Sequence, residues 1–175
     1  MMLVWVLVLT ALLASDVAGM SNSLGLEETQ HHIEKRHVGE EDCKVDWVYY
    51  PPLKSCFRFF CDKRTWTNAE EFCKHQHDFA HLTSVSSSEH NIFLQQMVDA
   101  VNNTCPQTWI GLNDILREGT LTWIDGSTHI YRHWLQGQPN DSGGNEDCVV
   151  INNDDEGLWS DRSCLETAGY ICSYY

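Results

Sequence analysis

Oxygen-bearing side chains gather in and around one stretch of this sequence. Residues 135–147 are rich in Gln, Gly, Pro, Asn, Asp and Ser and lack hydrophobic periodicity, which is typical of a long loop. Ca²⁺ accepts about six to eight oxygen ligands in flexible geometry, so a dense set of carboxylates and amides suits this ion. The stretch therefore indicates either a calcium site or a solvated surface loop. The candidate ligands in and near it are Asp114, Glu118, Gln138, Asn140, Asp141, Glu146, Asp147 and Asp161.

Short strands must frame this loop. Runs rich in aromatic and β-branched residues predict such strands, and the run 148–151 follows the loop directly. The predicted strands cover residues 55–60, 108–112, 120–124, 148–151 and 170–172.

Two amphipathic helices are expected between the first two predicted strands. Thr67 with Glu70, and Ser86 with Glu89, have the spacing of capping boxes, so each pair predicts a helix start. The apolar rows at helical spacing are Ala69, Phe72 and Cys73 in the first helix and Phe93, Met97 and Val101 in the second.

The N-terminal segment 1–19 has the features of a secretory signal peptide. Its apolar run covers residues 3–14 and is followed by small residues at 17–19. The run is short for a bilayer span, and a membrane anchor is the alternative. Residues 20–42 form a polar tail or pro-segment with a dibasic pair at 35–36, and the domain is expected over 43–175. We expect a secreted, extracellular protein without membrane insertion.

The chain contains eight cysteines, an even number that favours disulfides in an oxidising compartment. Zinc binding is the competing use, but the sequence contains no Cys-x-x-Cys pair. The net charge of −14 argues against nucleic acid and anionic membranes as partners. This charge suits a cation, or it serves solubility alone. The sequence also lacks a Gly-x-Ser-x-Gly motif, and every cysteine has a plausible partner, so we expect no enzyme activity.

Several motifs, taken in order, resemble the C-type lectin domain family. The resemblance covers about residues 43–172. Within the family, the sequence resembles the soluble fish-type lectins. It implies an α+β double-loop fold with two helices, two small antiparallel sheets and a long calcium-organising loop. The motifs that carry it are Cys73, Trp109-Ile110-Gly111-Leu112, Gln138-Pro139-Asn140, Glu146-Asp147-Cys148, Trp159-Ser160-Asp161, Cys164 and Cys172.

The resemblance also implies three disulfides. They are Cys73–Cys172, Cys148–Cys164 and Cys43–Cys56, the last of which marks the long form of the domain. Cys61 and Cys105 have no assigned partner in the family pattern. An internal bridge between them is preferred, and a bridge to another copy in a homo-oligomer is the alternative.

Two calcium sites follow from the same resemblance. In sugar-binding members the ligands of the principal ion also hydrogen-bond two adjacent sugar hydroxyls, and the Gln138–Pro139 peptide bond is expected to be cis. The matching principal residues here are Gln138, Asn140, Glu146, Ser160 and Asp161. An auxiliary ion uses positions that match Asp114, Glu118, Asp141, Glu146 and Asp147.

Two departures from the family pattern affect what the domain binds. The family's Trp-Asn-Asp is Trp159-Ser160-Asp161 here, so a shorter hydroxyl replaces a carbonyl ligand. The triplet Gln138-Pro139-Asn140 is neither the mannose-type Glu-Pro-Asn nor the galactose-type Gln-Pro-Asp.

The resemblance implies a calcium-dependent lectin for galactose- or mannose-type sugars. Its partners would be glycans on cell or microbial surfaces, in innate recognition or agglutination. The alternative is a domain without sugar binding that recognises a protein, as toxins and inhibitors of this fold do, or ice, as antifreeze relatives do. Asn102 lies in an Asn-x-Thr sequon and is expected to carry a glycan.

Overall fold

The computed structural model describes residues 43–101, 105–152 and 156–175. The expected signal peptide (1–19), the polar tail with its dibasic pair (20–42) and the sequon residue Asn102 lie outside the described residues. Within them, no helix is long and apolar enough to cross a membrane.

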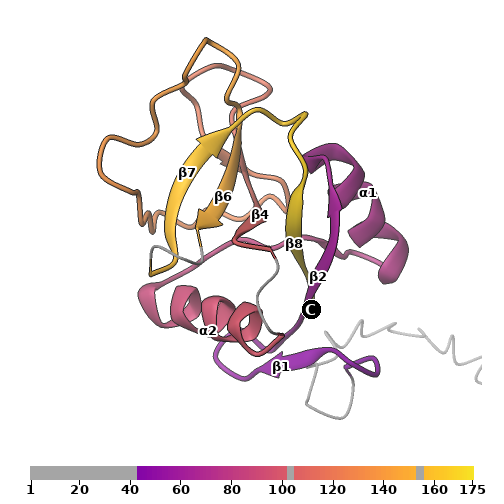
Figure 1. Cartoon of the computed structure of the whole chain (residues 1–175). Helices are drawn as coiled ribbons and strands as arrows, with labels where there is room; N and C mark the ends of the chain where they lie inside the picture. Colours follow the sequence, from indigo (N-terminus) through magenta and orange to yellow (C-terminus); the bar gives the residue numbers. More distant parts are fainter. Residues whose placement is uncertain (1–42, 102–104, 153–155) are drawn as a thin grey trace, which may run out of the picture. The chain divides into compact units, whose positions relative to one another are not determined.

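A mixed sheet forms the centre of the described domain (Figure 1). The strand order is β1-β2-β8-β4-β6-β7, with β3 paired to β8 and β5 paired to β4. All pairs are antiparallel except β4 and β8, which run parallel. The strands are β1 Val48–Tyr50, β2 Ser55–Arg64, β3 His81–Leu82, β4 Gln107–Asn113, β5 Thr122–Trp123, β6 Cys148–Asn152, β7 Leu158–Arg162 and β8 Ala168–Tyr174.

This arrangement confirms the α+β double-loop fold and refines one detail of it. The resemblance implied two small antiparallel sheets. The parallel pairing of β4 with β8, through Thr108 with Gly169 and Trp109 with Tyr170, joins the two antiparallel groups into one sheet. The strand that carries Asp161 is therefore connected, through the hydrogen-bonded sheet, to β8, whose Cys172 forms the core disulfide with Cys73 of the first helix.

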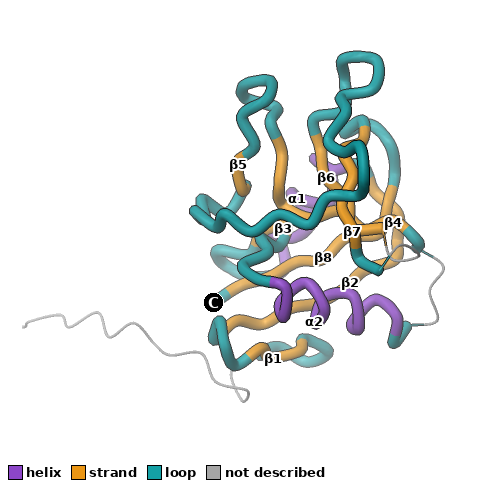
Figure 2. Tube along the Cα trace, turned by 90° about the vertical axis from the view of Figure 1, so that its left-hand side faces the viewer, coloured by secondary structure: helices purple, strands orange, loops and turns teal. Residues whose placement is uncertain are grey.

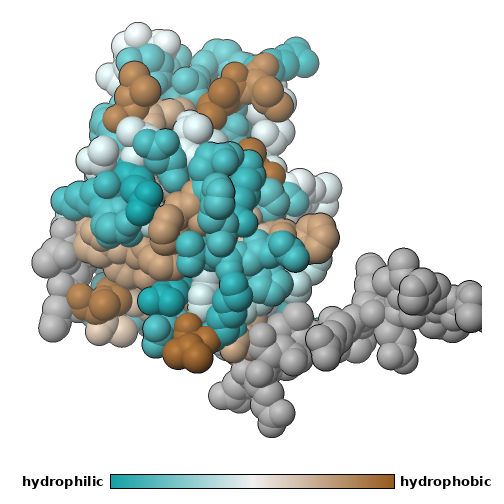
Figure 3. Space-filling model, turned by 90° about the vertical axis from the view of Figure 1, so that its right-hand side faces the viewer, coloured by the Kyte–Doolittle hydropathy of each residue, from teal (hydrophilic) through white to brown (hydrophobic). Residues whose placement is uncertain are grey.

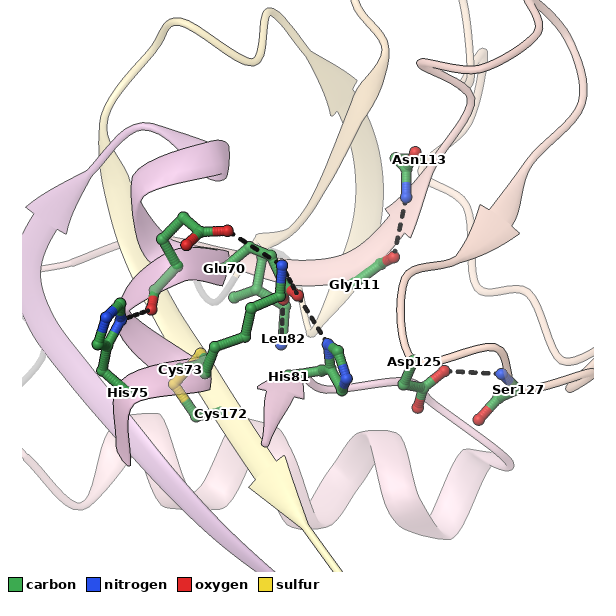
Figure 4. A network of polar contacts seen from close by, with 12 residues as sticks. Glu70, Cys73, His75, His81, Leu82, Gly111, Asn113, Asp125, Ser127 and Cys172 are labelled. Carbon is green, nitrogen blue, oxygen red and sulfur yellow. Dashed lines mark hydrogen bonds and ion pairs between the residues drawn. A yellow bond between two sulfur atoms is a disulfide. The ribbon is translucent and has the colours of Figure 1, made fainter. Parts of the chain in front are cut away.

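Helix α1 (Trp66–Gln76) begins two residues before the predicted start. Its N-cap is Thr65, whose side chain accepts from the amide of Asn68 at 3.4 Å. The Thr67–Glu70 capping box was wrong because the Glu70 carboxylate points inward, where it accepts from the Leu82 amide at 2.9 Å and contacts His81 Nδ1 at 2.7 Å (Figure 4).

Helix α2 (Ser88–Asp99) begins one residue later than its predicted box, with Ser87 as the N-cap that accepts from the His90 amide at 3.2 Å. The expected apolar row was also shifted, because the helix ends before Val101, which is 58% exposed. Figures 1 and 2 show α1 and α2 on opposite sides of the central strands. In place of the expected apolar row, the buried residues of α2 are His90, Asn91, Leu94 and Val98.

Four disulfides tie the elements together, and none of the described cysteines is free. They include the three pairs that the resemblance implied and the internal Cys61–Cys105 bridge, so Cys61 and Cys105 do not link two copies. The pairs are Cys43–Cys56, Cys61–Cys105, Cys73–Cys172 and Cys148–Cys164.

Two groups of buried side chains form the core. One surrounds Trp109, Tyr170 and the Cys73–Cys172 bridge, and the other surrounds Phe57, Leu94 and Trp159. Outside the core, the apolar patches on the face in Figure 3 are small and separated by hydrophilic surface. Burial of the aromatic side chains in these two core groups is the main stabilising contribution expected for a domain of this size.

Candidate functional site

The long loop is fixed at its base to strand β7. Trp134 forms an isolated parallel bridge with Trp159. The Leu135 amide donates to the Trp159 carbonyl at 2.8 Å, and the Trp159 amide donates to the His133 carbonyl at 2.7 Å. The Trp159 indole is fully buried and anchored in turn by Asn91 Oδ1 at 2.8 Å. The following residues are therefore held above the end of β7, at the top of the molecule in Figure 2.

Asp161 of β7 is the centre around which the loop folds. Its side chain is 3% exposed, and both carboxylate oxygens accept from the Asn140 amide at 2.9 and 3.1 Å. Oδ2 also accepts from the Asp141 amide at 2.7 Å. Hydrogen bonds to a charged acceptor are stronger than neutral ones, so this carboxylate fixes the position of the loop. An ionised carboxylate still retains lone pairs for a cation.

Two further carboxylates bind the loop's own backbone. Glu146 Oε2 accepts from the Ser142 amide at 2.9 Å, and Asp141 Oδ1 accepts from the Glu146 amide at 3.1 Å. Arg162 lies 3.9 Å from Glu146 Oε1. Hydrogen bonds thus bring together Asn140, Asp141, Glu146 and Asp161, four of the residues that the sequence singled out.

Gln138 supplies an unpaired acceptor in the same loop. Its Oε1 is buried and has no hydrogen-bond partner among the described residues. The Gln138–Pro139 peptide bond is cis, as expected. A buried acceptor without a partner is unfavourable unless a ligand satisfies it, and a hard cation does so.

Ser160 faces a different neighbour. Neighbouring strand residues point to opposite faces, so Asp161 and Ser160 do not share a face. The Ser160 hydroxyl is fully buried and accepts from Asn152 Nδ2 of β6 at 3.0 Å. The Asn152 amide also donates to the Leu158 carbonyl at 2.9 Å. No hydrogen bond in the described part of the chain links Ser160 to the loop donors.

The carboxyl groups proposed for the auxiliary ion lie close together. The Asp114 amide donates to the Asp147 carbonyl at 3.1 Å, and Asp114 Oδ2 accepts from the Gly119 amide at 2.9 Å. Burial raises the pKa of Asp114, and the charges of Asp147 and Asp141 raise it further against the opposing Gly119 bond. Desolvation and the charges of Asp114, Asp141 and Asp147 also raise the pKa of Glu118. A cation among these groups would relieve their repulsion.

These groups do not form a closed metal cage. Within the described ranges, no three His, Cys, Asp or Glu side chains converge closely enough to hold a metal ion as they stand. The donor chemistry nevertheless fits a hard cation, because Gln138 Oε1 has no partner and the auxiliary carboxyls repel one another. The residues that would hold the principal ion are Gln138, Asn140, Glu146 and Asp161.

Comparison with known proteins decides the family. Residues 62–174 match the family model for the lectin C-type domain. This chain belongs to the C-type lectin family. Members of this family are binding proteins, not enzymes. The match spans α1, the long loop and all strands from β3 to β8.

Relatives of this C-type lectin domain cover most of its length. A lectin of Pleurodeles waltl is 33% identical over 134 residues, which are 77% of each chain. The alpha-N-acetylgalactosamine-specific lectin of Patiria pectinifera is 34% identical over 131 residues, 72% of this chain and 76% of that one. The crystal structure of C-type lectin CEL-I from Cucumaria echinata has a TM-score of 0.71 at 31% identity, covering 75% of this chain and 96% of that one.

Sequence reasoning missed two residues that shape this C-type lectin site. Asn152 holds the Ser160 hydroxyl, and Arg162 lies beside Glu146. Asn152 ends the apolar run 148–152, so a polar residue at the end of a buried strand was the available signal. Arg162 carried no signal of its own, because its contact depends on the pairing of β6 with β7.

Proposed function

We propose that this C-type lectin domain is a secreted lectin that binds glycans on cell or microbial surfaces with the help of Ca²⁺, in innate recognition or agglutination. The main support for this proposal is that the loop folds around buried Asp161, while Gln138 Oε1 has no hydrogen-bond partner among the described residues. The name of the Patiria pectinifera relative, an alpha-N-acetylgalactosamine-specific lectin, supports carbohydrate as the ligand class.

The protein's own groups would divide the work in this site. A bound calcium ion would coordinate sugar hydroxyls directly. Glu146 and Asp161 would neutralise the ion and accept hydrogen bonds from those hydroxyls. The amides of Gln138 and Asn140 would each offer an oxygen to the ion and an N–H donor to the sugar. Two amide donors suit either a galactose-type or a mannose-type hydroxyl pair, so both sugars belong in the test.

An affinity column tests the proposal directly. The protein should bind immobilised galactose or mannose in calcium buffer and elute with a chelator. Asp161→Asn removes a charge that holds both the loop and the proposed ion, so retention should be lost. Asp78→Asn, an exposed change outside the loop, is the matched control and should be retained. Failure of the wild-type protein to bind either column would contradict the proposal.

The secretory features need a separate measurement. We propose that segment 1–19 is removed on secretion and that Asn102 carries a glycan. Mass spectrometry of the product from eukaryotic cells would give the new N-terminus and the added mass at Asn102. A product that retains residue 1, or that lacks a glycan at Asn102, would contradict the corresponding part.

The Ser160–Asn152 contact favours a second candidate function. A principal site without this ligand binds calcium less tightly, and a domain of this kind can recognise a protein or ice without sugar. In that case calcium would leave the melting temperature unchanged, because an ion that does not bind the native state cannot stabilise it. A rise in melting temperature with calcium would favour the lectin.

A further inference from the structure

A cavity of the domain lies away from the calcium loop. Its volume is about 360 Å³, at the lower end of the range of about 300–1,000 Å³ that is typical of small-molecule sites. Five parts of the chain meet there: the start of β2, the segment after β3, helix α2, the turn after β5 and the end of β8. It shares no residue with the proposed calcium ligands.

His90 lines this cavity and carries a polar atom that the fold leaves unsatisfied. The residue is 1% exposed, and its Nε2 has no hydrogen-bond partner among the described residues. The Ser86 amide donates to Nδ1 at 3.3 Å, so in the neutral ring the proton resides on Nε2. Burial, with a smaller contribution from the charge of His129, lowers the pKa of His90 to about 4, which keeps the ring neutral at physiological pH. His90 therefore offers a donor that requires an acceptor.

Asp125 gives the cavity its charge. One carboxylate oxygen accepts from the Ser127 amide at 2.8 Å, which fixes the side chain in the turn after β5 (Figure 4). Among the described residues, no lysine or arginine lines the cavity. The net charge of the chain is −14, so the surrounding potential also attracts cations and repels anions.

The rest of the lining is suited to an organic molecule. Phe57 and Leu53 provide apolar surface, and the hydroxyls of Ser84 and Ser127 contact each other at 3.1 Å. These hydroxyls can each donate or accept. We propose that this cavity binds a small organic cation that carries a hydrogen-bond acceptor, with the acceptor on His90 and the cationic group near Asp125.

A series of three probes of similar size and different charge tests the proposal. They are phenylalaninamide (cationic), 3-phenylpropanamide (neutral) and 3-phenylpropanoate (anionic). Each is added to the full chain at about pH 6, where the amino group of the first probe is protonated, and with a chelator so that the calcium loop binds no ion. Saturation-transfer NMR measures binding, and the amide signals of Gly126 and Ser127 locate it. We expect the cation to bind about tenfold more tightly than the neutral probe, and the anion not to bind.

Two variants separate the effect of the Asp125 charge from that of the His90 hydrogen-bond donor. Asp125→Asn keeps the oxygen that accepts from Ser127 but should abolish the preference for the cation, whereas the exposed control Asp99→Asn should not. His90→Phe should weaken both amide probes. Should His90→Phe fail to fold, Asp125→Asn still decides the matter.

Three results would overturn the proposal. They are no binding of any probe at roughly 10 mM, equal binding of all three charges, or a cation preference that survives Asp125→Asn. Asp161→Asn provides independence from the lectin proposal, because it should abolish sugar retention and leave probe binding unchanged. Failure of one proposal is thus distinguishable from failure of the other.

Discussion

Ser160 shows how one side chain decides the composition of a site. Its hydroxyl accepts a hydrogen bond from the Asn152 side chain and lies on the opposite face of β7 from the Asp161 carboxylate. Ser160→Ala should therefore leave calcium affinity within about twofold, while the loss of one buried hydrogen bond lowers the free energy of unfolding by about 1 kcal/mol. Isothermal titration with calcium and urea denaturation measure the two effects. A clear loss of calcium affinity would show that Ser160 is a ligand.

His90 makes stability depend on pH. Its folded pKa of about 4 lies below the unfolded value of 6.5, so the unfolded chain binds an additional proton between these values. This contribution is complete above pH 6.5 and is lost as the pH falls to about 4, which amounts to roughly 3 kcal/mol. Urea midpoints from pH 7 to pH 4 measure the slope. His90→Phe should flatten it, and the exposed control His75→Gln should not.

At the scale of elements, disulfides fix different parts of the fold. Cys61–Cys105 joins β2 to the segment before β4 with a sequence separation of 44, and Cys148–Cys164 holds β6 to the segment after β7 with a separation of 16. Loop-closure entropy gives about 4 kcal/mol for the first bridge and about 3 kcal/mol for the second. Only the second borders the calcium loop.

The double replacement of each pair by alanine tests this division. Cys61→Ala with Cys105→Ala should lower the free energy of unfolding by about 4 kcal/mol and preserve calcium affinity. Cys148→Ala with Cys164→Ala should lower both stability and calcium affinity, because the base of the loop loses its support. Chemical denaturation and calcium titration provide the two readouts. Equal calcium affinity in both variants would contradict the assignment.

The elements themselves were partly predictable. Aromatic-rich runs located β2, β4 and β8, because side chains such as Phe57 and Trp109 fill the core. Strand β7 was not predicted, since its polar residues Ser160 and Asp161 are buried by pairing with β6 and not by their own hydrophobicity. The start of α1 was displaced by two residues because tertiary contacts of Trp66 and Glu70 outweighed the local capping pattern. The start of α2 was displaced by one residue because Ser87, and not Ser86, accepts from the His90 amide and caps the helix.

The residues of the site could be predicted from the sequence, but the contacts between them could not. The oxygen-rich loop and its family pattern indicated Asp141, Glu146 and Asp161, which hydrogen bonds connect in space. The contact of Ser160 with Asn152 depends on strand register, and the cavity at His90 depends on the meeting of five segments. Neither arrangement leaves a pattern in the linear sequence.

At the scale of the whole molecule, calcium should couple to stability. The carboxyls around Asp114 and Glu118 repel one another, and an ion that binds only the folded state removes that cost. Calcium at about one hundred times its dissociation constant should add roughly 2.7 kcal/mol, and chelator should reverse this. Differential scanning calorimetry measures the shift. Combining Asp161→Asn with Asp147→Asn should abolish it, and a persistent shift would place calcium elsewhere.

The outer strands determine how the domain can be presented. Tyr49 of β1 and Tyr174 of β8 both pair with Cys56 of β2, so the two ends of the domain leave from the strands on either side of β2. Figure 1 shows that end of the sheet opposite the long loop. A bead, a sensor surface or a multimeric scaffold fused at either end would therefore leave the long loop facing outward. Arrays built in this way would gain avidity for repeated ligands without any change in the individual site.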